Sequence, residues 1–186
     1  MKLPIVAYGD PVLKKVCAPI DETYPDLKQL ISNMFDTMYN AHGIGLAAPQ
    51  IGLPIRLFIV DTGVDEEEKQ GFKSAFINAE ILEETGEPWA FNEGCLSIPD
   101  IREDVFRKPN ILIRYYDENW ELHEEKISGI LARVIQHEYD HIQGKLFTET
   151  LSLLRKRMLK SKLDAISKGN VKVDYKMRFP QQSRRR

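Results

Sequence analysis

The sequence predicts an α+β fold, with antiparallel sheets packed around a central metal-binding helix and further helices near both termini. Two stretches with helical spacing of apolar residues flank a middle region of short apolar runs separated by turns. Between that region and the last helix lies a His-Glu-x-x-His motif, whose two histidines share one face of a helix. The 186 residues are enough for one domain with its own core.

The first predicted elements are a surface segment and a long helix. Residues 1–23 carry turn signals and little periodicity, so we expect them to wrap the surface. Between Pro25, which suits a first helical turn, and Gly43, which suits a helix end, apolar residues recur at steps of three and four. The sequence therefore predicts one buried helical face, formed by Leu27, Leu30, Ile31, Met34, Phe35 and Met38.

A run of small residues from Gly43 to Gln50 follows this helix. Its Gly-x-Gly pattern invites a nucleotide-binding interpretation, but a helix precedes it and the third glycine is missing, so we reject that interpretation. Small residues instead let the backbone approach a substrate or another chain segment closely. Gln50 either offers its amide N–H to a ligand or is an ordinary polar turn residue, and the sequence leaves both open.

Short strands are predicted in the middle of the chain, from runs rich in branched and aromatic residues. The last of them forms a hairpin with residues 121–124 across a turn at 117–119, and the acidic residues 65–68 form a solvated loop. The predicted strands are 55–60, 76–78, 98–105 and 111–116.

The metal-binding helix is predicted from Ser128, a capping residue, to Gly144, a left-handed terminator. His137 and His141 can bind one metal ion, and Glu138 beside them can take a proton from a water on that ion. By itself the motif also fits an ordinary amphipathic helix with two histidines.

A catalytic site needs a third protein ligand. The long metzincin motif would place a histidine at position 147, which is Phe147; for a thermolysin-like site, Glu149 is too close and Asp164 is the wrong acid. Cys95 follows a glycine that allows close backbone approach, and we predict it as the third ligand. One thiolate and two imidazoles suit Zn²⁺.

The chain's charge is uneven: residues 1–150 hold 14 Lys and Arg against 26 Asp and Glu, whereas residues 151–186 hold 12 against 2. Helical spacing predicts a basic amphipathic helix over 151–166, a single domain over 1–168, and a basic, loosely ordered tail over 169–186. A basic segment on an acidic body favours a polyanion such as RNA, although a solvated helix face is the commoner explanation.

Composition points to the cytoplasm. The only cysteines are Cys17 and Cys95, which argues against a disulfide scaffold and favours a reducing compartment. The N-terminal apolar run is too short for a signal peptide, and we find no run of the roughly 18 apolar residues that a membrane span needs.

Three motifs together resemble those of the bacterial peptide deformylases: Gly-x-Gly-x-Ala-Ala-x-Gln at 43–50, Glu-Gly-Cys-Leu-Ser at 93–97 and Gln-His-Glu-x-x-His at 136–141. Every fixed position matches, and the resemblance covers residues 1 to about 168. It implies an enzyme that removes the formyl group from N-terminal formyl-methionine of new polypeptides and releases formate.

The resemblance also implies roles for individual residues. Cys95, His137 and His141 would bind one divalent ion, Fe²⁺ in the family, with Zn²⁺, Ni²⁺ or Co²⁺ accepted; Glu138 would be the general acid–base, and the Gln50 amide and Leu96 N–H would bind the oxyanion. Family pockets vary at positions 91 and 133, and we expect Arg102 to pair with a carboxylate such as Glu93. The residues expected around the substrate are Gly43, Ile44, Gly45, Phe91, Glu93, Ile130, Arg133 and Val134.

Some family members approach the ribosome near the peptide exit, so the basic C-terminal helix is a candidate ribosome contact. Two other functions remain open from the motif alone. One is a zinc endopeptidase. The other is a non-catalytic RNA- or ribosome-binding module with a structural metal, which would need Cys17, His42 or His123 as a fourth ligand.

Overall fold

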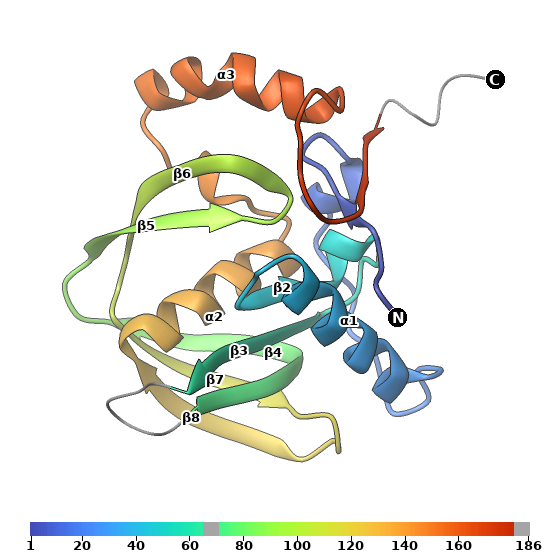
Figure 1. The fold of residues 1–186 in the computed structure, drawn as a ribbon. Coiled ribbons are helices and arrows are strands. Elements are labelled where there is room, and N and C mark those ends of the chain that lie inside the picture. Colours follow the sequence, from blue (N-terminus) through green and yellow to red (C-terminus); the bar gives the residue numbers. More distant parts are fainter. Residues whose placement is uncertain (65–70, 181–186) are drawn as a thin grey trace.

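The computed structural model describes residues 1–64 and 71–180. One helix, α2 (Gly129–Ile142), lies between two antiparallel sheets (Figure 1). The larger sheet has the strand order β2-β3-β4-β7-β8, and the smaller is the hairpin β5-β6. The strands are β2 (Gly45–Ala47), β3 (Leu57–Val64), β4 (Gly71–Thr85), β7 (Asn110–Tyr116), β8 (Leu122–Ser128), β5 (Trp89–Cys95) and β6 (Ile98–Arg107).

Burial explains this central position of α2. Ala132, Ile135 and Ile142 are fully buried in a core cluster with side chains of the larger sheet. A second cluster packs α1 (Leu27–Asn40) against the same sheet through Ile31, Met34 and Met38. The predicted α+β class and the predicted long N-terminal helix are therefore confirmed.

The predicted hairpin is confirmed, since β7 and β8 pair in register from Asn110↔Ser128 to Tyr116↔Leu122. Ser128 occupies the N-cap position of α2 as predicted, but its side chain makes no capping hydrogen bond; Gly144 has φ 71° in the left-handed region that ends the helix. Strands β2 and β5 were not predicted, because Gly, Ala and Asn are weak strand formers. The loop predicted at 65–68 lies outside the described residues.

A third sheet joins the two ends of the chain. Strand β1 (Ile5–Val6) pairs in parallel with β9 (Met177–Arg178), beside the 3₁₀ turn at Pro11–Lys14. Both residues of β1 are fully buried, so the expectation that residues 1–23 merely wrap the surface is wrong for this strand. This sheet is parallel, and the sequence did not predict it.

The prediction of a loosely ordered tail from residue 169 is wrong for residues 169–180. After α3 (Leu153–Ser167), the chain returns to the body of the protein and forms β9 (Figure 1). Apolar and polar residues alternate strictly from Val171 to Phe179, and the apolar ones are half-buried. This period of two is a strand signal in the sequence itself, and the basic composition of the segment obscured it.

Helix α3 is the predicted C-terminal helix, with Ser152 capping it by accepting a hydrogen bond from the Arg155 N–H. It packs through Leu159, Leu163 and Ile166, whereas Leu154 and Met158 are exposed. No helix among the described residues is both long enough and apolar enough to cross a membrane.

Candidate active site

Helix α2 and the end of β5 bring three metal-ligating side chains together. His137 and His141 share one face of α2, and their ring centroids are 5.1 Å apart. Cys95 Sγ lies 3.3 Å from His141 Nε2. The Cys95 sulfur and one ring nitrogen from each of the two histidines all lie within 4.8 Å of one another. The structure thus places together the three ligands that the sequence predicted.

The donor set fits a divalent ion with one open position. Among the residues that the structure describes, no fourth protein ligand joins this group. The three alternatives lie elsewhere: Cys17 contacts Lys15 O, His42 lies 3.3 Å from Asp174, and His123 lies 3.1 Å from Asp117. Three protein ligands with a free position are characteristic of catalytic rather than structural sites.

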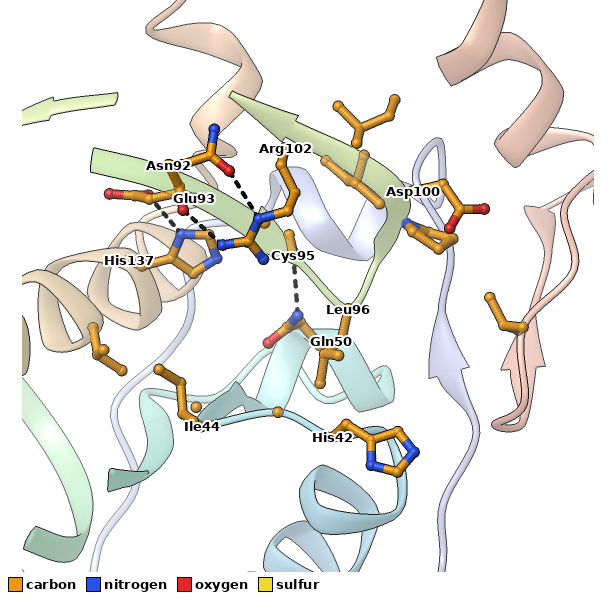
Figure 2. A pocket seen from close by; sticks show the side chains of 18 of the residues that line it. His42, Ile44, Gln50, Asn92, Glu93, Cys95, Leu96, Asp100, Arg102 and His137 are labelled. Carbon is orange, nitrogen blue, oxygen red and sulfur yellow. Dashed lines mark hydrogen bonds and ion pairs between the residues drawn. The ribbon is translucent and has the colours of Figure 1, made fainter. Parts of the chain in front are cut away.

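The surroundings of the two histidines shift their pKa values in opposite directions. Burial lowers the pKa of His141 well below its usual value, which favours the neutral imidazole that metal binding requires. Burial would also lower the pKa of His137, but hydrogen bonds with Cys95 and Glu93 raise it to about 10. Glu93 Oε2 lies 3.0 Å from His137 Nδ1, so the carboxylate orients the ring and increases its basicity (Figure 2).

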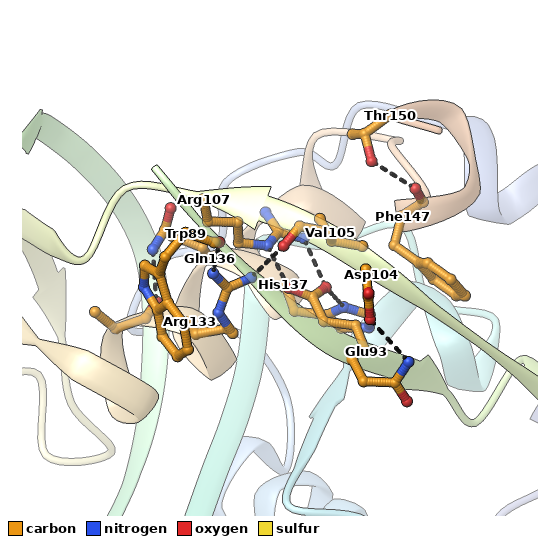
Figure 3. Close-up of polar contacts among 12 residues, drawn as sticks. Trp89, Glu93, Asp104, Val105, Arg107, Arg133, Gln136, His137, Phe147 and Thr150 are labelled. Carbon is orange, nitrogen blue, oxygen red and sulfur yellow. Dashed lines mark hydrogen bonds and ion pairs between the residues drawn. The ribbon is translucent and has the colours of Figure 1, made fainter. Parts of the chain in front are cut away.

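Glu93 is the centre of a buried ion cluster. Its carboxylate accepts two hydrogen bonds from Arg107, at 2.8 and 3.1 Å, and one from Arg133, at 2.7 Å (Figure 3). Burial alone would raise the pKa of Glu93, but hydrogen bonds from His137 and Arg107 lower it to about 2. Arg107 also donates to Asp140, at 2.7 Å. The cluster therefore links α2 to the β5-β6 hairpin.

Arg133 was expected to lie near the substrate, and it does line the cavity, but its guanidinium is buried. It donates to the backbone oxygens of Val105 and Trp89 as well as to Glu93. The Trp89 ring lies over the guanidinium, 4.4 Å from centroid to Cζ (Figure 3). Through these non-covalent contacts, Arg133 connects α2 to the β5-β6 hairpin.

The expected pairing of Arg102 with Glu93 is wrong. Arg102 donates instead to Asn92, at 2.9 Å to Oδ1 and 2.6 Å to the backbone oxygen (Figure 2). The reason is the two-residue period of a strand, since Glu93 is in register with Glu103. Arg107 therefore shares the face of Glu93, and Arg102 points to the opposite face.

Glu138 lies beside the metal-ligating group in a site almost closed to water. It is 5% exposed, and burial raises the pKa of its carboxyl to about 7. Its Oε2 atom has no hydrogen-bond partner among the described residues. A carboxylate with a pKa near 7 and an unused oxygen can exchange a proton with a bound molecule at neutral pH.

Gly45 on β2 provides the space that Glu138 needs. A Cβ atom added at position 45 would lie 2.8 Å from both Cγ and Cδ of Glu138. The run of small residues in the sequence thus has a steric cause here, because strand β2 passes directly over the carboxylate.

Replacing Gly45 with alanine is expected to lower the kcat for formyl-peptide hydrolysis by about 10- to 100-fold, since small misplacement of a catalytic group has effects of that size. The added methyl group must displace Glu138 or β2. Steady-state formate release, with circular dichroism as a folding control, measures the effect. Unchanged kcat in a folded Gly45→Ala variant would show that the position of Glu138 is not restricted by β2.

Gln50 lies next to Cys95 in space, and Leu96 follows Cys95 in the chain. Gln50 is buried, and its Oε1 accepts a hydrogen bond from Ala47 N at 2.8 Å. This contact fixes the orientation of the amide, whose Nε2 lies 3.5 Å from Cys95 Sγ and 3.4 Å from Ser97 Oγ (Figure 2). The Gln50 amide group therefore presents its N–H donors to the ligand side of the site.

A cavity of about 830 Å³ opens onto these groups. Its lining includes the predicted Gly43, Ile44, Gly45, Gln50, Phe91, Glu93, Cys95, Leu96, Arg133, Val134, His137 and Glu138. Ile130 lies in the first turn of α2, is 45% exposed and is outside this lining. Further lining residues were not predicted from the sequence, and they include His42, Asn92, Pro99, Asp100 and the segment Lys172–Tyr175.

A half-buried thiol and two imidazoles that can hold one divalent ion, next to a carboxyl group of raised pKa, are the groups expected of a metal-dependent hydrolase. Comparisons with known proteins identify the family. The polypeptide deformylase model matches residues 2–157. The peptide deformylase of Christiangramia forsetii is 62% identical, over 97% of each chain, and that of Flavobacterium psychrophilum is 56% identical, over 96% of this chain and 97% of the relative.

Solved structures agree with the sequence relatives. A peptide deformylase from Legionella pneumophila superposes with a TM-score of 0.80 at 36% identity, over 91% of this chain and 98% of that one. A peptide deformylase from Thermotoga maritima gives 0.74 at 39% identity, over 82% of this chain and 99% of that one. The chain belongs to the polypeptide deformylase family, and it is an enzyme that removes the formyl group from the N-terminal methionine of new polypeptides.

Proposed function

We propose that the reaction runs in the cavity in front of Cys95, with the residues just described in the roles that the resemblance assigned. The observation that carries this proposal is the convergence of the Glu138 carboxyl, the Gln50 amide, Cys95 and His137 on one opening, with His141 grouped beside Cys95 and His137. A divalent ion held there by Cys95, His137 and His141 would activate a water molecule and polarise the formyl oxygen.

Glu138 supplies the proton transfers. Its carboxylate accepts a proton from the attacking water and later returns it to the leaving amine, so that formate and a free N-terminus are the products. The Gln50 side-chain N–H and the Leu96 backbone N–H donate hydrogen bonds to the oxygen on which negative charge develops. Since that charge exists mainly in the transition state, these donors accelerate the reaction rather than tighten substrate binding.

The methionine side chain enters the apolar part of the cavity, between Ile44, Phe91 and Val134. Ile44 and Phe91 are partly exposed, at 50% and 37%, and a bound methionine would cover them. Gly43 and Gly45 lie close to the peptide backbone, and Ile130 would contribute only at the outer edge. Glu93 and Arg133 act behind this surface by holding His137 and the hairpin.

The ion in the cell is Fe²⁺ in this proposal, with Zn²⁺, Ni²⁺ or Co²⁺ as possible replacements. The thiolate and imidazole donors by themselves favour Zn²⁺, and the preference for iron rests on the resemblance. The proposed location is the cytoplasm, where newly made polypeptides are found.

The decisive experiment uses protein prepared without oxygen and loaded with Fe²⁺. It is incubated with a formyl-Met-Ala-Ser peptide and, as a control, with the acetylated peptide, while formate and free amine are measured. We expect formate from the formyl peptide only, loss of activity after chelation, and recovery when Fe²⁺ is returned. A folded, metal-loaded enzyme that releases no formate would overturn the proposal, and casein cleavage would then test the endopeptidase alternative.

We also propose that α3 contributes to ribosome binding through its exposed basic side chains. Arg155 is a poor probe, because it donates to Glu103 at 2.9 Å and so holds α3 to β6. Arg157 and Lys162 are exposed on the same helix and are better choices.

The Arg157→Glu, Lys162→Glu double variant is expected to reduce salt-sensitive co-sedimentation with ribosomes by about tenfold, because two phosphate contacts would be lost and replaced by repulsion. Activity on free peptides should not change. Lys28→Glu and Lys126→Glu, two exposed lysines on other elements, form the matched control. Equal co-sedimentation of both double variants would argue against α3 as the contact.

A further inference from the structure

The segment 170–178, here called the C-terminal strap, lies beyond residue 157, where the match to the family model ends. The chain leaves α3 at Gly169, which has φ 78°, and Asn170 N donates to Ala165 O at 2.9 Å. The strap then runs back beside the N-terminal strand (Figure 1). Ile5 N and Ala7 N donate to Lys176 O and Arg178 O, both at 2.9 Å, which anchors its far end.

The strap is part of the wall of the active-site cavity. Its residues Lys172, Val173, Asp174 and Tyr175 line the opening together with Leu96 and Gly43. The side chains alternate: Lys172 and Asp174 are exposed, and Val173 and Tyr175 are half-buried. The apolar face of the strap is therefore turned inward, and Tyr175 packs against the core cluster that contains Met38 and Leu46.

Tyr175 makes a specific contact with the turn that carries the proposed catalytic groups. Its hydroxyl donates a hydrogen bond to Leu96 O at 2.8 Å. Burial raises the pKa of this hydroxyl above its usual value, so it remains a donor at neutral pH. Leu96 lies directly after Cys95, between the ligand and Ser97.

Two further contacts restrain the turn that contains Cys95, Leu96 and Ser97. Tyr8 N, just after β1, donates to Ser97 O at 2.8 Å. The Leu96 side chain packs directly on the Gly43 backbone, because a Cβ atom added at Gly43 would lie 2.8 Å from Leu96 Cδ1. The β1-β9 pair thus reaches two successive carbonyls of the turn, one through Tyr8 and one through Tyr175.

We propose that Tyr175 is a positioning residue for deformylation: by holding the Leu96 carbonyl, its hydroxyl fixes the orientation of Leu96 and aims the Leu96 N–H at the developing oxyanion. This inference rests on the proposed role of the Leu96 N–H. A donor that is held in place before reaction costs no reorganisation when charge appears. The strap therefore contributes to the rate although its hydroxyl touches no reacting atom.

The test is Tyr175→Phe, which removes the hydroxyl and keeps the ring that packs on the core. We expect kcat per bound metal ion to fall by about tenfold, while KM for formyl-Met-Ala-Ser changes by less than about twofold. Metal content and Tm should match those of the wild type. The split between kcat and KM is the informative readout, because general loosening of the cavity wall would also weaken substrate binding.

Two variants serve as controls. Lys176→Ala changes an exposed side chain on the same strap that does not line the active-site cavity, and Tyr115→Phe removes a hydroxyl that lies 3.4 Å from Glu125 on the larger sheet. Both should retain wild-type kcat. An unchanged kcat in Tyr175→Phe, or a loss matched by an equal rise in KM, would overturn the inference. Failure of the wild-type enzyme itself to release formate would instead overturn the proposed function.

Discussion

Replacing Glu138 with glutamine is expected to reduce formate release by about 10²- to 10⁴-fold, the range that general acid–base catalysis contributes. Glutamine has nearly the same shape but cannot carry the proton from water to amine. The buried site offers no evident substitute, because Glu93 is occupied by His137, Arg107 and Arg133. Single-turnover formate release from formyl-Met-Ala-Ser measures the loss.

The metal content of Glu138→Gln should equal that of the wild type, because Glu138 is not among the three grouped ligands. KM should change little. A variant that binds no metal would assign Glu138 to the metal site, and a variant with normal activity would remove it from the reaction altogether. These two results contradict the proposed role in different ways, so metal analysis must accompany the kinetics.

Replacing Glu93 with glutamine is expected to destabilise the fold by about 3–5 kcal/mol, because removing one partner of a buried ion cluster leaves charges uncompensated. The side chains of Glu93, Arg107 and Arg133 are only 5%, 9% and 3% exposed. Metal affinity should also fall, by about 10- to 100-fold, since His137 loses the carboxylate that orients it. Denaturant unfolding and metal titration measure the two effects.

The matched control is Glu124→Gln, which breaks an exposed pair with Arg114 at 2.8 Å and should cost at most about 1 kcal/mol.

The pH dependence of stability offers a second check on the role of Glu93. Because the pKa of Glu93 is lowered to about 2, its contribution to stability is present above the ordinary value of 4.5 and is lost as pH falls toward 2. The Glu93→Gln variant should lack that part of the loss of stability at acid pH. Equal stability of the Glu93→Gln and Glu124→Gln variants would argue against the ion cluster as a structural link.

The parts of the molecule that sequence predicts well are those determined by short-range spacing. The four-residue separation of His137 and His141 places both on one helical face whatever the rest of the chain does. The helix from Leu27 and the hairpin after Asn110 likewise follow from local periodicity and turn chemistry. For the same reason, His137, His141 and Glu138 could be named before their geometry was known, whereas Cys95 is distant in sequence and was predicted from its own motif and by exclusion of other ligands.

The parts that sequence did not predict depend on register between distant strands. Whether Arg102 or Arg107 reaches Glu93 depends on which β6 residue lies opposite it, and one residue of slip reverses the answer. The burial of Arg133 depends on carbonyls supplied by Trp89 and Val105 on two other strands. The strap did have a local signal, but its partner β1 lies at the opposite end of the sequence.

The pairing of β1 with β9 has a consequence for how the enzyme folds during its own synthesis. Ile5 is synthesised long before its partner Met177. At a synthesis rate of about 5–20 residues per second, β1 waits roughly ten to thirty seconds for β9. During that interval Leu96 lacks its contact with Tyr175. An enzyme that acts on growing polypeptides therefore gains the contact between Tyr175 and Leu96 only after its own residues 175–178 have been synthesised.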